Sequence, residues 1–145
     1  MSPATGVLSV VAMMALTSCS SAPPTVTVSA GGQSEVLSPT QYCLDGEAEF
    51  YPEAERPPVL RVAPDEQITI EVSEGLAESG WQVQVFDEAL EEQLGQVPVG
   101  NLSVFDGIST SDAQPPAYFL VIVEDAGSGC EGLSGAWPIG FVRDG

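Results

Sequence analysis

Apolar and polar residues alternate along much of the chain, which is the pattern of strands with one buried face. Residues 25–29 (TVTVS) alternate and lead through Gly31-Gly32 into residues 34–37 (SEVL), so a hairpin is predicted there. Residues 67–73 (QITIEVS) place three β-branched residues on one face. Residues 81–86 (WQVQVF) place the apolar residues Trp81, Val83 and Val85 on one face. Each of these segments is predicted to be a half-buried strand.

Three further segments complete the predicted strands. Residues 58–62 (PVLRV) end at a turn formed by Pro64-Asp65. Residues 118–123 (YFLVIV) are apolar on both faces, which indicates a central strand. Residues 135–142 (GAWPIGFV) contain Pro138, and the missing amide proton predicts an edge strand or a bulge.

Two segments do not follow the alternating pattern. Residues 73–80 predict a short helix or turn that ends at Gly80. Residues 87–95 (DEALEEQLG) fit a helix, because Phe86, Leu90 and Leu94 are four apart, but they equally fit the loop of a long hairpin. The hairpin is preferred, since it joins WQVQVF to the apolar segment LGQVPVG.

The regular spacing of strands and of Gly/Pro turns predicts an all-β fold, an immunoglobulin-like β-sandwich. Residues 43–58 (CLDGEAEFYPEAERPP) form the longest irregular segment and are predicted to be a surface loop. A single β-sandwich domain over residues 25–145 accommodates all of these elements.

The segment before the first strand has the features of a targeting sequence. Residues 6–16 (GVLSVVAMMAL) are apolar over about eleven positions, which suits a signal peptide and is shorter than the roughly 20 residues that span a bilayer. Leu16-Thr17-Ser18-Cys19 resembles the bacterial lipobox. That resemblance implies a signal peptide over residues 1–18, cleavage before Cys19, and a diacylglycerol on the Cys19 thiol. Residues 19–24 are then the lipidated cysteine and a short tether.

One feature departs from this pattern, because the first six residues (MSPATG) contain no Lys or Arg. The alternatives are an ordinary secretory signal or a buried strand with an ordinary cysteine. With two or three acyl chains, Cys19 would hold the protein stably on the bilayer, whereas a single chain gives marginal binding.

The chain contains three cysteines, an odd number. If Cys19 is lipidated, Cys43 and Cys130 remain, and outside the cytoplasm they are predicted to form a disulfide. No C-x-x-C motif supports a redox role for them.

Several motifs resemble a known family. SPTQYC (residues 38–43), the pattern P-x-L-x-V-A-P (58–64), the strand ITIEVS and EGLAESGW (74–81) resemble uncharacterised actinobacterial lipoproteins, domain of unknown function 2771. In that family a second cysteine often lies shortly after the QYC cysteine; here Cys130 takes that place. The resemblance implies an envelope lipoprotein and no assigned activity.

Charge narrows the choice of partners. The chain has 21 acidic residues and a net charge of -18, with Arg56, Arg61 and Arg143 as its cations. Such a chain repels phosphates, so nucleic acid is not expected as a partner. Solvation of the surface is the simpler interpretation of the acidic residues, ahead of a role in binding cations or basic proteins.

The residues for most known catalytic devices are missing. The chain has no histidine, which removes Ser-His and Cys-His nucleophiles and most zinc sites. The acidic pairs Asp87/Glu88, Glu91/Glu92 and Glu124/Asp125 are interpreted as solvated turn carboxylates, because neighbouring strand residues point to opposite faces. Calcium is the most suitable metal for carboxylates, yet no EF-hand loop is present. We therefore expect no enzyme, no cofactor and no metal site.

Two classes of function remain. The first is a non-catalytic, lipid-anchored module on the extracytoplasmic face of the cell membrane, which binds the bilayer through acylated Cys19 and serves an envelope or membrane-complex protein. The second is a lipoprotein that binds a small ligand or a cation. A large exposed apolar patch favours the first class, and a concave pocket with converging polar groups favours the second.

Overall fold

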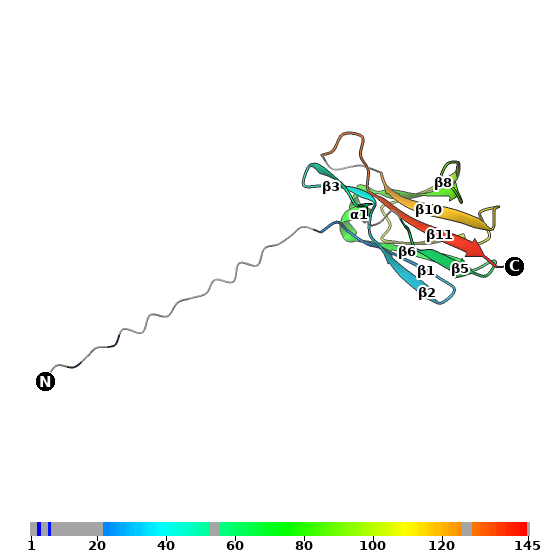
Figure 1. The fold of residues 1–145 in the computed structure, drawn as a ribbon, viewed down its shortest axis with the longest axis horizontal. Coiled ribbons are helices and arrows are strands. Elements are labelled where there is room, and N and C mark those ends of the chain that lie inside the picture. Colours follow the sequence, from blue (N-terminus) through cyan, green and yellow to red (C-terminus); the bar gives the residue numbers. More distant parts are fainter. Residues whose placement is uncertain (1–2, 4–5, 7–21, 53–55, 126–128, 145) are drawn as a thin grey trace.

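The computed structural model describes residues 22–52, 56–125 and 129–144, together with Pro3 and Gly6. The described residues form eleven strands and one short helix, arranged as two packed sheets (Figure 1). The predicted all-β sandwich is confirmed. Apart from Pro3 and Gly6, the predicted signal peptide (residues 1–18) lies outside the described residues, and so does Cys19.

The smaller sheet has four strands in the order β2-β1-β6-β9, and its neighbouring strands are antiparallel. The predicted hairpin across Gly31-Gly32 is confirmed, and both glycines have positive φ, as a tight turn requires. The strands of this sheet are β1 (Val26–Ala30), β2 (Gln33–Leu37), β6 (Gln67–Val72) and β9 (Val104–Ser109).

The larger sheet has the order β4-β3-β11-β10-β7-β8, and β5 pairs in parallel with β11. The predicted central strand is confirmed, because β10 lies between β7 and β11 and pairs with both along most of its length. The strands of this sheet are β3 (Gln41–Leu44), β4 (Glu47–Phe50), β5 (Val59–Val62), β7 (Trp81–Asp87), β8 (Gln93–Gly100), β10 (Ala117–Glu124) and β11 (Ala136–Arg143).

The ambiguous segment after WQVQVF forms a hairpin turn between β7 and β8, as preferred from the sequence. The Asp87 carboxylate organises this turn. Its Oδ1 atom accepts hydrogen bonds from the backbone N–H groups of Glu91 (2.8 Å) and Glu92 (3.1 Å). An aspartate that bonds the backbone a few residues ahead stabilises a turn locally and competes with a helix there.

The inward faces of the two sheets form one apolar core. Ile68 and Ile70 of β6 and Ile122 of β10 are fully buried, as their alternation predicts. Two buried tryptophans, Trp81 and Trp137, have hydrogen-bond partners for their ring nitrogens. Trp81 Nε1 donates to the Leu102 carbonyl (2.7 Å) and Trp137 Nε1 donates to the Pro24 carbonyl (2.9 Å). These bonds satisfy polar atoms that burial would otherwise leave unpaired.

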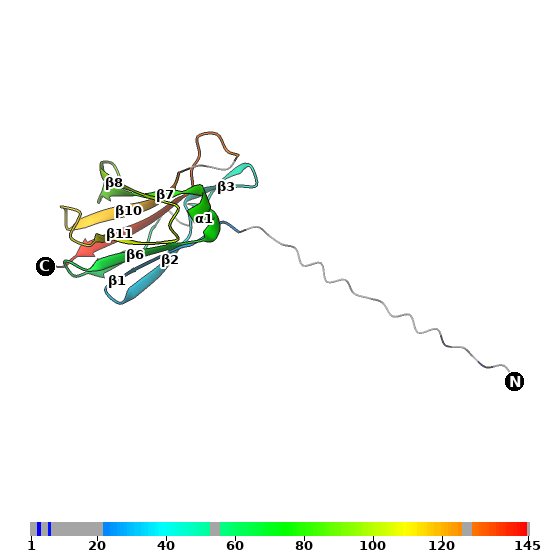
Figure 2. The ribbon, with the colours of Figure 1, turned by 180° about the vertical axis from the view of Figure 1, so that it is seen from behind.

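A short helix, α1 (Glu74–Ser79), lies at one end of the sandwich, as Figure 2 shows from behind. The Ser73 side chain caps its N-terminus by accepting from Leu76 N–H (3.3 Å), and Gly80 ends it at a φ of 83°. Of the two predicted alternatives, a helix or a turn, the segment forms a helix, and its predicted end at Gly80 is confirmed. Its buried Leu76 joins the core.

The prediction that Pro138 marks an edge strand or a bulge is wrong, because β11 has neighbours on both sides. β3 pairs with β11 at Ala136, and β5 begins to pair with it at Gly140. Pro138 lies between these two partial partners, while its other side faces Val121 of β10. A strand interior can thus hold a proline where one neighbouring strand has ended and the next has not begun.

The prediction of an irregular loop over residues 43–58 is wrong in part. Its first half forms a hairpin, in which Cys43 pairs with Ala48 and Leu44 with Glu47. The turn consists of Asp45 and Gly46, and both have positive φ. An Asp-Gly pair is a strong hairpin signal, and here it was present in the sequence.

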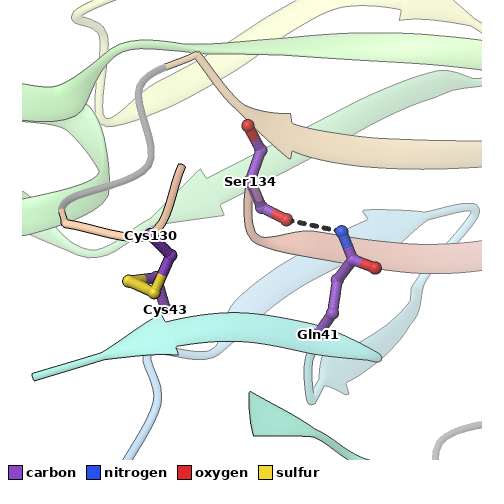
Figure 3. Close-up of a disulfide and its surroundings, with 4 residues drawn as sticks. All are labelled: Gln41, Cys43, Cys130 and Ser134. Carbon is purple, nitrogen blue, oxygen red and sulfur yellow. Dashed lines mark hydrogen bonds between the residues drawn. A yellow bond between two sulfur atoms is a disulfide. The ribbon is translucent and has the colours of Figure 1, made fainter. Parts of the chain in front are cut away.

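The disulfide predicted between Cys43 and Cys130 is confirmed (Figure 3). Their Cα atoms are 5.7 Å apart, within the range that a bridge requires, and 87 positions separate them in sequence. Close to the disulfide, Gln41 Nε2 donates to the Ser134 carbonyl (2.8 Å), as the dashed line in Figure 3 shows. Both contacts attach the segment before β11 to the β3–β4 hairpin.

Removal of the disulfide should lower the free energy of unfolding substantially. The bond closes a loop across 87 positions, for which chain entropy gives a stabilisation of about 4–5 kcal/mol. The double variant Cys43→Ala/Cys130→Ala should therefore unfold at a much lower urea concentration than the oxidised protein. Reduction of the wild-type protein is the matched control and should reproduce the loss; an unchanged urea midpoint in both would contradict this account.

Candidate functional site

A cavity of about 470 Å³ lies between the two sheets, where the sandwich is open along one side. This opening exists because β8 is the last strand of the larger sheet and β9 is the last strand of the smaller one. Both strands contribute to the lining, so we call this space the intersheet cavity. Its apolar lining includes Val85, Leu94, Val97, Ile108, Tyr118 and Leu120, and its polar lining includes Gln96, Ser109, Asp112 and Gln114.

One wall of the intersheet cavity is the loop between β9 and β10, residues 110–116, and Arg143 of β11 holds this loop. The Arg143 guanidinium donates to the carbonyl oxygens of Thr110 (2.9 Å), Ala113 (2.8 Å) and Gln114 (3.2 Å). Hydrogen bonds from a charged donor are stronger than neutral ones. A single cation therefore fixes three points of the wall.

Thr110 and Tyr118 attach the same loop to the core. Thr110 is fully buried; its side chain donates to the Ala63 carbonyl (2.7 Å), and its backbone N–H donates to the Glu66 carbonyl (2.8 Å). The Tyr118 hydroxyl donates to the Thr110 carbonyl (2.9 Å). Burial raises the pKa of Tyr118 to about 12, although the nearby Arg143 charge opposes that shift. The hydroxyl therefore remains a hydrogen-bond donor at neutral pH.

Asp112 is exposed at the mouth of the intersheet cavity. Its Oδ2 atom accepts from the Ser109 backbone N–H (2.8 Å), which is a turn-stabilising bond. Among the lining residues that the structure describes, Asp112 is the charged one. The mouth is therefore polar and negative, and the interior is apolar.

A second feature lies on the outer face of the larger sheet. On β10 the inward residues alternate with Phe119, Val121 and Val123, which are half-buried and face outward. Phe86 of β7 is the register partner of Phe119 and is also half-buried. We call these four residues the outer apolar face. Partly exposed apolar side chains that share one face of adjacent strands form a candidate contact surface for another protein.

The interpretation of all the acidic pairs as solvated carboxylates is wrong for Glu124. Glu88, Glu91 and Glu92 are exposed at the β7–β8 turn, as expected. Glu124, at the end of β10, is only 3% exposed, and its Oε1 atom has no hydrogen-bond partner. Burial raises its pKa, and this effect exceeds the opposing interactions with the Ser79 side chain and the Gly135 backbone.

The charge of Glu124 also raises the pKa of Tyr42 on β3, where burial is the larger cause. The Tyr42 ring in turn contacts Trp137, with ring centroids 5.9 Å apart. The pattern AYFLVIVE held the signal for this burial, since Glu124 continues the inward series Tyr118, Leu120, Ile122. Its place at the strand end suggested solvent, but the Ser79 side chain and the Gly135 backbone lie beside it.

Of the residues singled out in the sequence, Cys43 and Cys130 are brought together, and Cys19 lies outside the described residues. Within residues 22–52, 56–125 and 129–144, no group of three or more acidic or cysteine side chains gathers as a metal site would. No helix in the described part of the chain is long and apolar enough to cross a membrane. The position of the intersheet cavity was not predicted, because it depends on which strands end each sheet.

Comparison with known proteins gives one match. Residues 20–104 match the family described as "Protein of unknown function (DUF2771)". The matched range includes the β1–β2 hairpin, Cys43, α1 and the β7–β8 hairpin, whereas β10, β11 and Cys130 lie beyond it. No curated protein and no solved structure matches the chain.

Replacement of Arg143 by alanine should loosen the loop at residues 110–116 and destabilise the fold. The variant loses three charge-assisted hydrogen bonds, so we expect a decrease of about 1–3 kcal/mol in the free energy of unfolding. Hydrogen exchange should also speed up at the amides of Ser111 and Asp112. Arg61→Ala is the matched control: Arg61 forms an exposed ion pair with Asp144, and its loss should cost below about 1 kcal/mol. Equal effects of the two substitutions would contradict the role given to Arg143.

Replacement of Glu124 by glutamine should change how stability depends on pH. In the folded protein the pKa of Glu124 lies above its ordinary value of 4.5, so the folded state keeps the proton that the unfolded chain has lost. Stability from the neutral acid is complete at low pH and is lost as the pH rises through the folded pKa. Glu124→Gln stays neutral, so its advantage in urea unfolding should grow as the pH rises above 4.5 and become constant once the pH exceeds the raised pKa of the folded state. The exposed Glu71→Gln should show no such trend; a constant difference for Glu124→Gln would reject this explanation.

Proposed function

The chain belongs to the DUF2771 family, and we propose that it is a lipid-anchored, non-catalytic binding module on the extracytoplasmic face of the cell membrane. The anchor is acylated Cys19, released as the first residue when the segment 1–18 is cleaved. Leu16-Thr17-Ser18-Cys19 after a short apolar run supports this assignment. No other anchor is required, because two or more acyl chains hold a protein stably on a bilayer.

The disulfide supports the compartment. Disulfides persist in oxidising environments outside the cytoplasm, and Cys43 and Cys130 are bonded in the folded structure. The remaining cysteine of the chain is Cys19. Its lipidation explains why a protein with one disulfide carries an odd number of cysteines.

The position of the tether gives the module an orientation. Pro24 leads into β1 at the end of the sandwich that carries α1 and the β3–β4 hairpin, and the C-terminus lies at the opposite end (Figure 1). The hydrogen bond from Trp137 to the Pro24 carbonyl holds the tether at its point of entry. An anchor five residues before Pro24 would keep the α1 end toward the bilayer and direct the C-terminal end outward.

The outer apolar face is the observation that carries the binding half of the proposal. Phe119 and Phe86 lie side by side on neighbouring strands, and Val121 and Val123 extend the same face along β10. A tether of a few residues keeps this face close to membrane-embedded neighbours. The partner is therefore a protein of the envelope or of a membrane complex, and contact occurs mainly through apolar side chains.

Several features argue against catalysis and against nucleic acid as a partner. The chain has no histidine, and its net charge is -18. A surface of this charge repels phosphates. At the β7–β8 turn the Asp87 carboxylate accepts backbone hydrogen bonds and so stabilises the turn itself.

A second candidate function is favoured by the intersheet cavity. Its volume of about 470 Å³ falls in the range of about 300–1,000 Å³ for small-ligand pockets. The loop at residues 110–116 places the cavity toward the C-terminal end, away from the tether. A small-ligand-binding lipoprotein is thus the alternative to a protein-binding module.

Mass spectrometry of the protein purified from its own membrane should find a diacylglycerol on an N-terminal Cys19. The Cys19→Ala variant should leave the membrane fraction or keep residues 1–18, because its side chain offers no thiol for acylation.

In mild detergent, a partner protein bound through apolar contacts should copurify with the wild type at both low and high salt. Salt screens exposed charge pairs and leaves apolar contacts intact.

Variants of the outer apolar face separate a specific partner from background. Phe119→Gln should lose the copurifying protein, whereas Gln84→Ala, on the same face of the sheet, should retain it. An unmodified Cys19 in a membrane-derived sample would reject the anchor. Retention of the partner by Phe119→Gln would reject the outer apolar face as the contact.

A further inference from the structure

We propose that the intersheet cavity binds a single-chain amphiphile, with the apolar chain inside the cavity and a cationic or uncharged head group at the mouth beside Asp112. This inference deepens the binding role proposed above and concerns its second candidate function. It rests on the shape of the cavity, the composition of its lining and the position of every cation in the chain.

The interior suits a hydrocarbon chain. Val85 and Leu120 come from the larger sheet and Ile108 from the smaller one, so both apolar faces of the sandwich contribute to the lining. The one polar group that reaches the interior from β10, the Tyr118 hydroxyl, is already bonded to the Thr110 carbonyl. An apolar chain would therefore leave no buried polar group unpaired, which is the usual penalty for filling a pocket with hydrocarbon.

The mouth excludes a negative head group. Asp112 is exposed there, and its bond to Ser109 N–H fixes its position without neutralising its charge. Gln96 and Gln114 add exposed amides, which suit uncharged polar groups as well as cations. A carboxylate or phosphate head would meet a like charge.

None of the three arginines lines the intersheet cavity. Arg143 keeps its positive charge, but its guanidinium donates its hydrogen bonds to the carbonyl oxygens of the loop wall and not to a group at the mouth. Arg61 is paired with Asp144, and Arg56 lines a different depression beside Pro138. The chain contains no lysine or histidine. Fatty acids and acidic phospholipids are therefore poor occupants, whereas an amine or an uncharged head group is compatible with the mouth.

The test compares three probes with the same chain length, decyltrimethylammonium, decyl maltoside and decanoate, each below its micelle concentration. The full chain carries Cys19→Ser, so that no acyl group or membrane competes, and the Cys43–Cys130 bond is kept oxidised. Methyl NMR reports on Val85, Val97, Ile108 and Leu120, which localises binding to the cavity and separates it from binding at residues 6–16. We expect these methyl signals to shift with the cationic and uncharged probes, at an affinity at least about tenfold above that for decanoate.

Variants then assign the preference to the proposed groups. Asp112→Asn keeps an acceptor for Ser109 N–H and removes the charge, so the preference over decanoate should shrink to about twofold or less. Glu71→Gln, an exposed charge on β6, is the matched control and should leave the preference unchanged. Ala113→Phe should reduce binding of all three probes by filling the cavity. The methyl spectrum of the unliganded Ala113→Phe variant shows whether that variant is folded. Asp112→Asn tests the inference independently of it.

Tighter binding of decanoate, or shifts confined to residues outside the cavity lining, would overturn this inference. Binding of an extended peptide along β8 in place of the probes would also overturn it. The anchor is tested separately by the mass of Cys19. An acylated Cys19 with no probe in the cavity would reject the amphiphile site and retain the lipid-anchored module. Probe binding to a protein whose native Cys19 is unmodified would retain the amphiphile site and reject the lipid anchor.

Discussion

The burial of β10 is the constraint on which the rest of the structure depends. β10 pairs with β7 along one side and with β11 along the other, while Leu120 and Ile122 point at the smaller sheet. Both of its faces are apolar, so it is stable only inside a sheet that is covered by a second layer. The smaller sheet supplies that layer through Ile68 and Ile70 of β6. The remaining strands extend the two sheets outward from this contact.

The candidate sites follow from where that contact ends. Tyr118 and Leu120 on the inward face of β10 line the intersheet cavity, which lies between β8 and β9, the last strands of the two sheets. The outward face, with Phe119 at its centre, has no second layer among the described residues and forms the outer apolar face. Arg143 links the two features, because β11 supports β10 in the sheet and its guanidinium fixes the loop that walls the cavity.

The two ends of the sandwich differ in how they are closed. At the tether end, the Trp137–Pro24 hydrogen bond and the Cys43–Cys130 disulfide fix the entering chain and the segment before β11. At the other end, the closing contacts are hydrogen bonds from Arg143 and Thr110 to backbone carbonyls. The disulfide thus lies at the end of the sandwich where a lipid anchor would exert force on the protein. The cavity lies at the end that is closed by hydrogen bonds. This arrangement suits a module held at one end and binding at the other.

The sequence by itself determined the local structure: alternation gave the strands and their buried faces, Ser73 and Gly80 gave the limits of α1, and cysteine number gave the disulfide. The strands and the helix depend on residues close in sequence, and the disulfide was inferred from the number of cysteines. Only the tertiary structure decided that Pro138 lies inside a sheet, that β5 joins β11 in parallel, and that Glu124, which the alternation places on the inward face, is covered even at the end of its strand. An alternating pattern specifies which side of a strand is buried but carries no information about which strand pairs with it. The intersheet cavity depends on that non-local choice, because it forms where β8 and β9 were left as the last strands of their sheets.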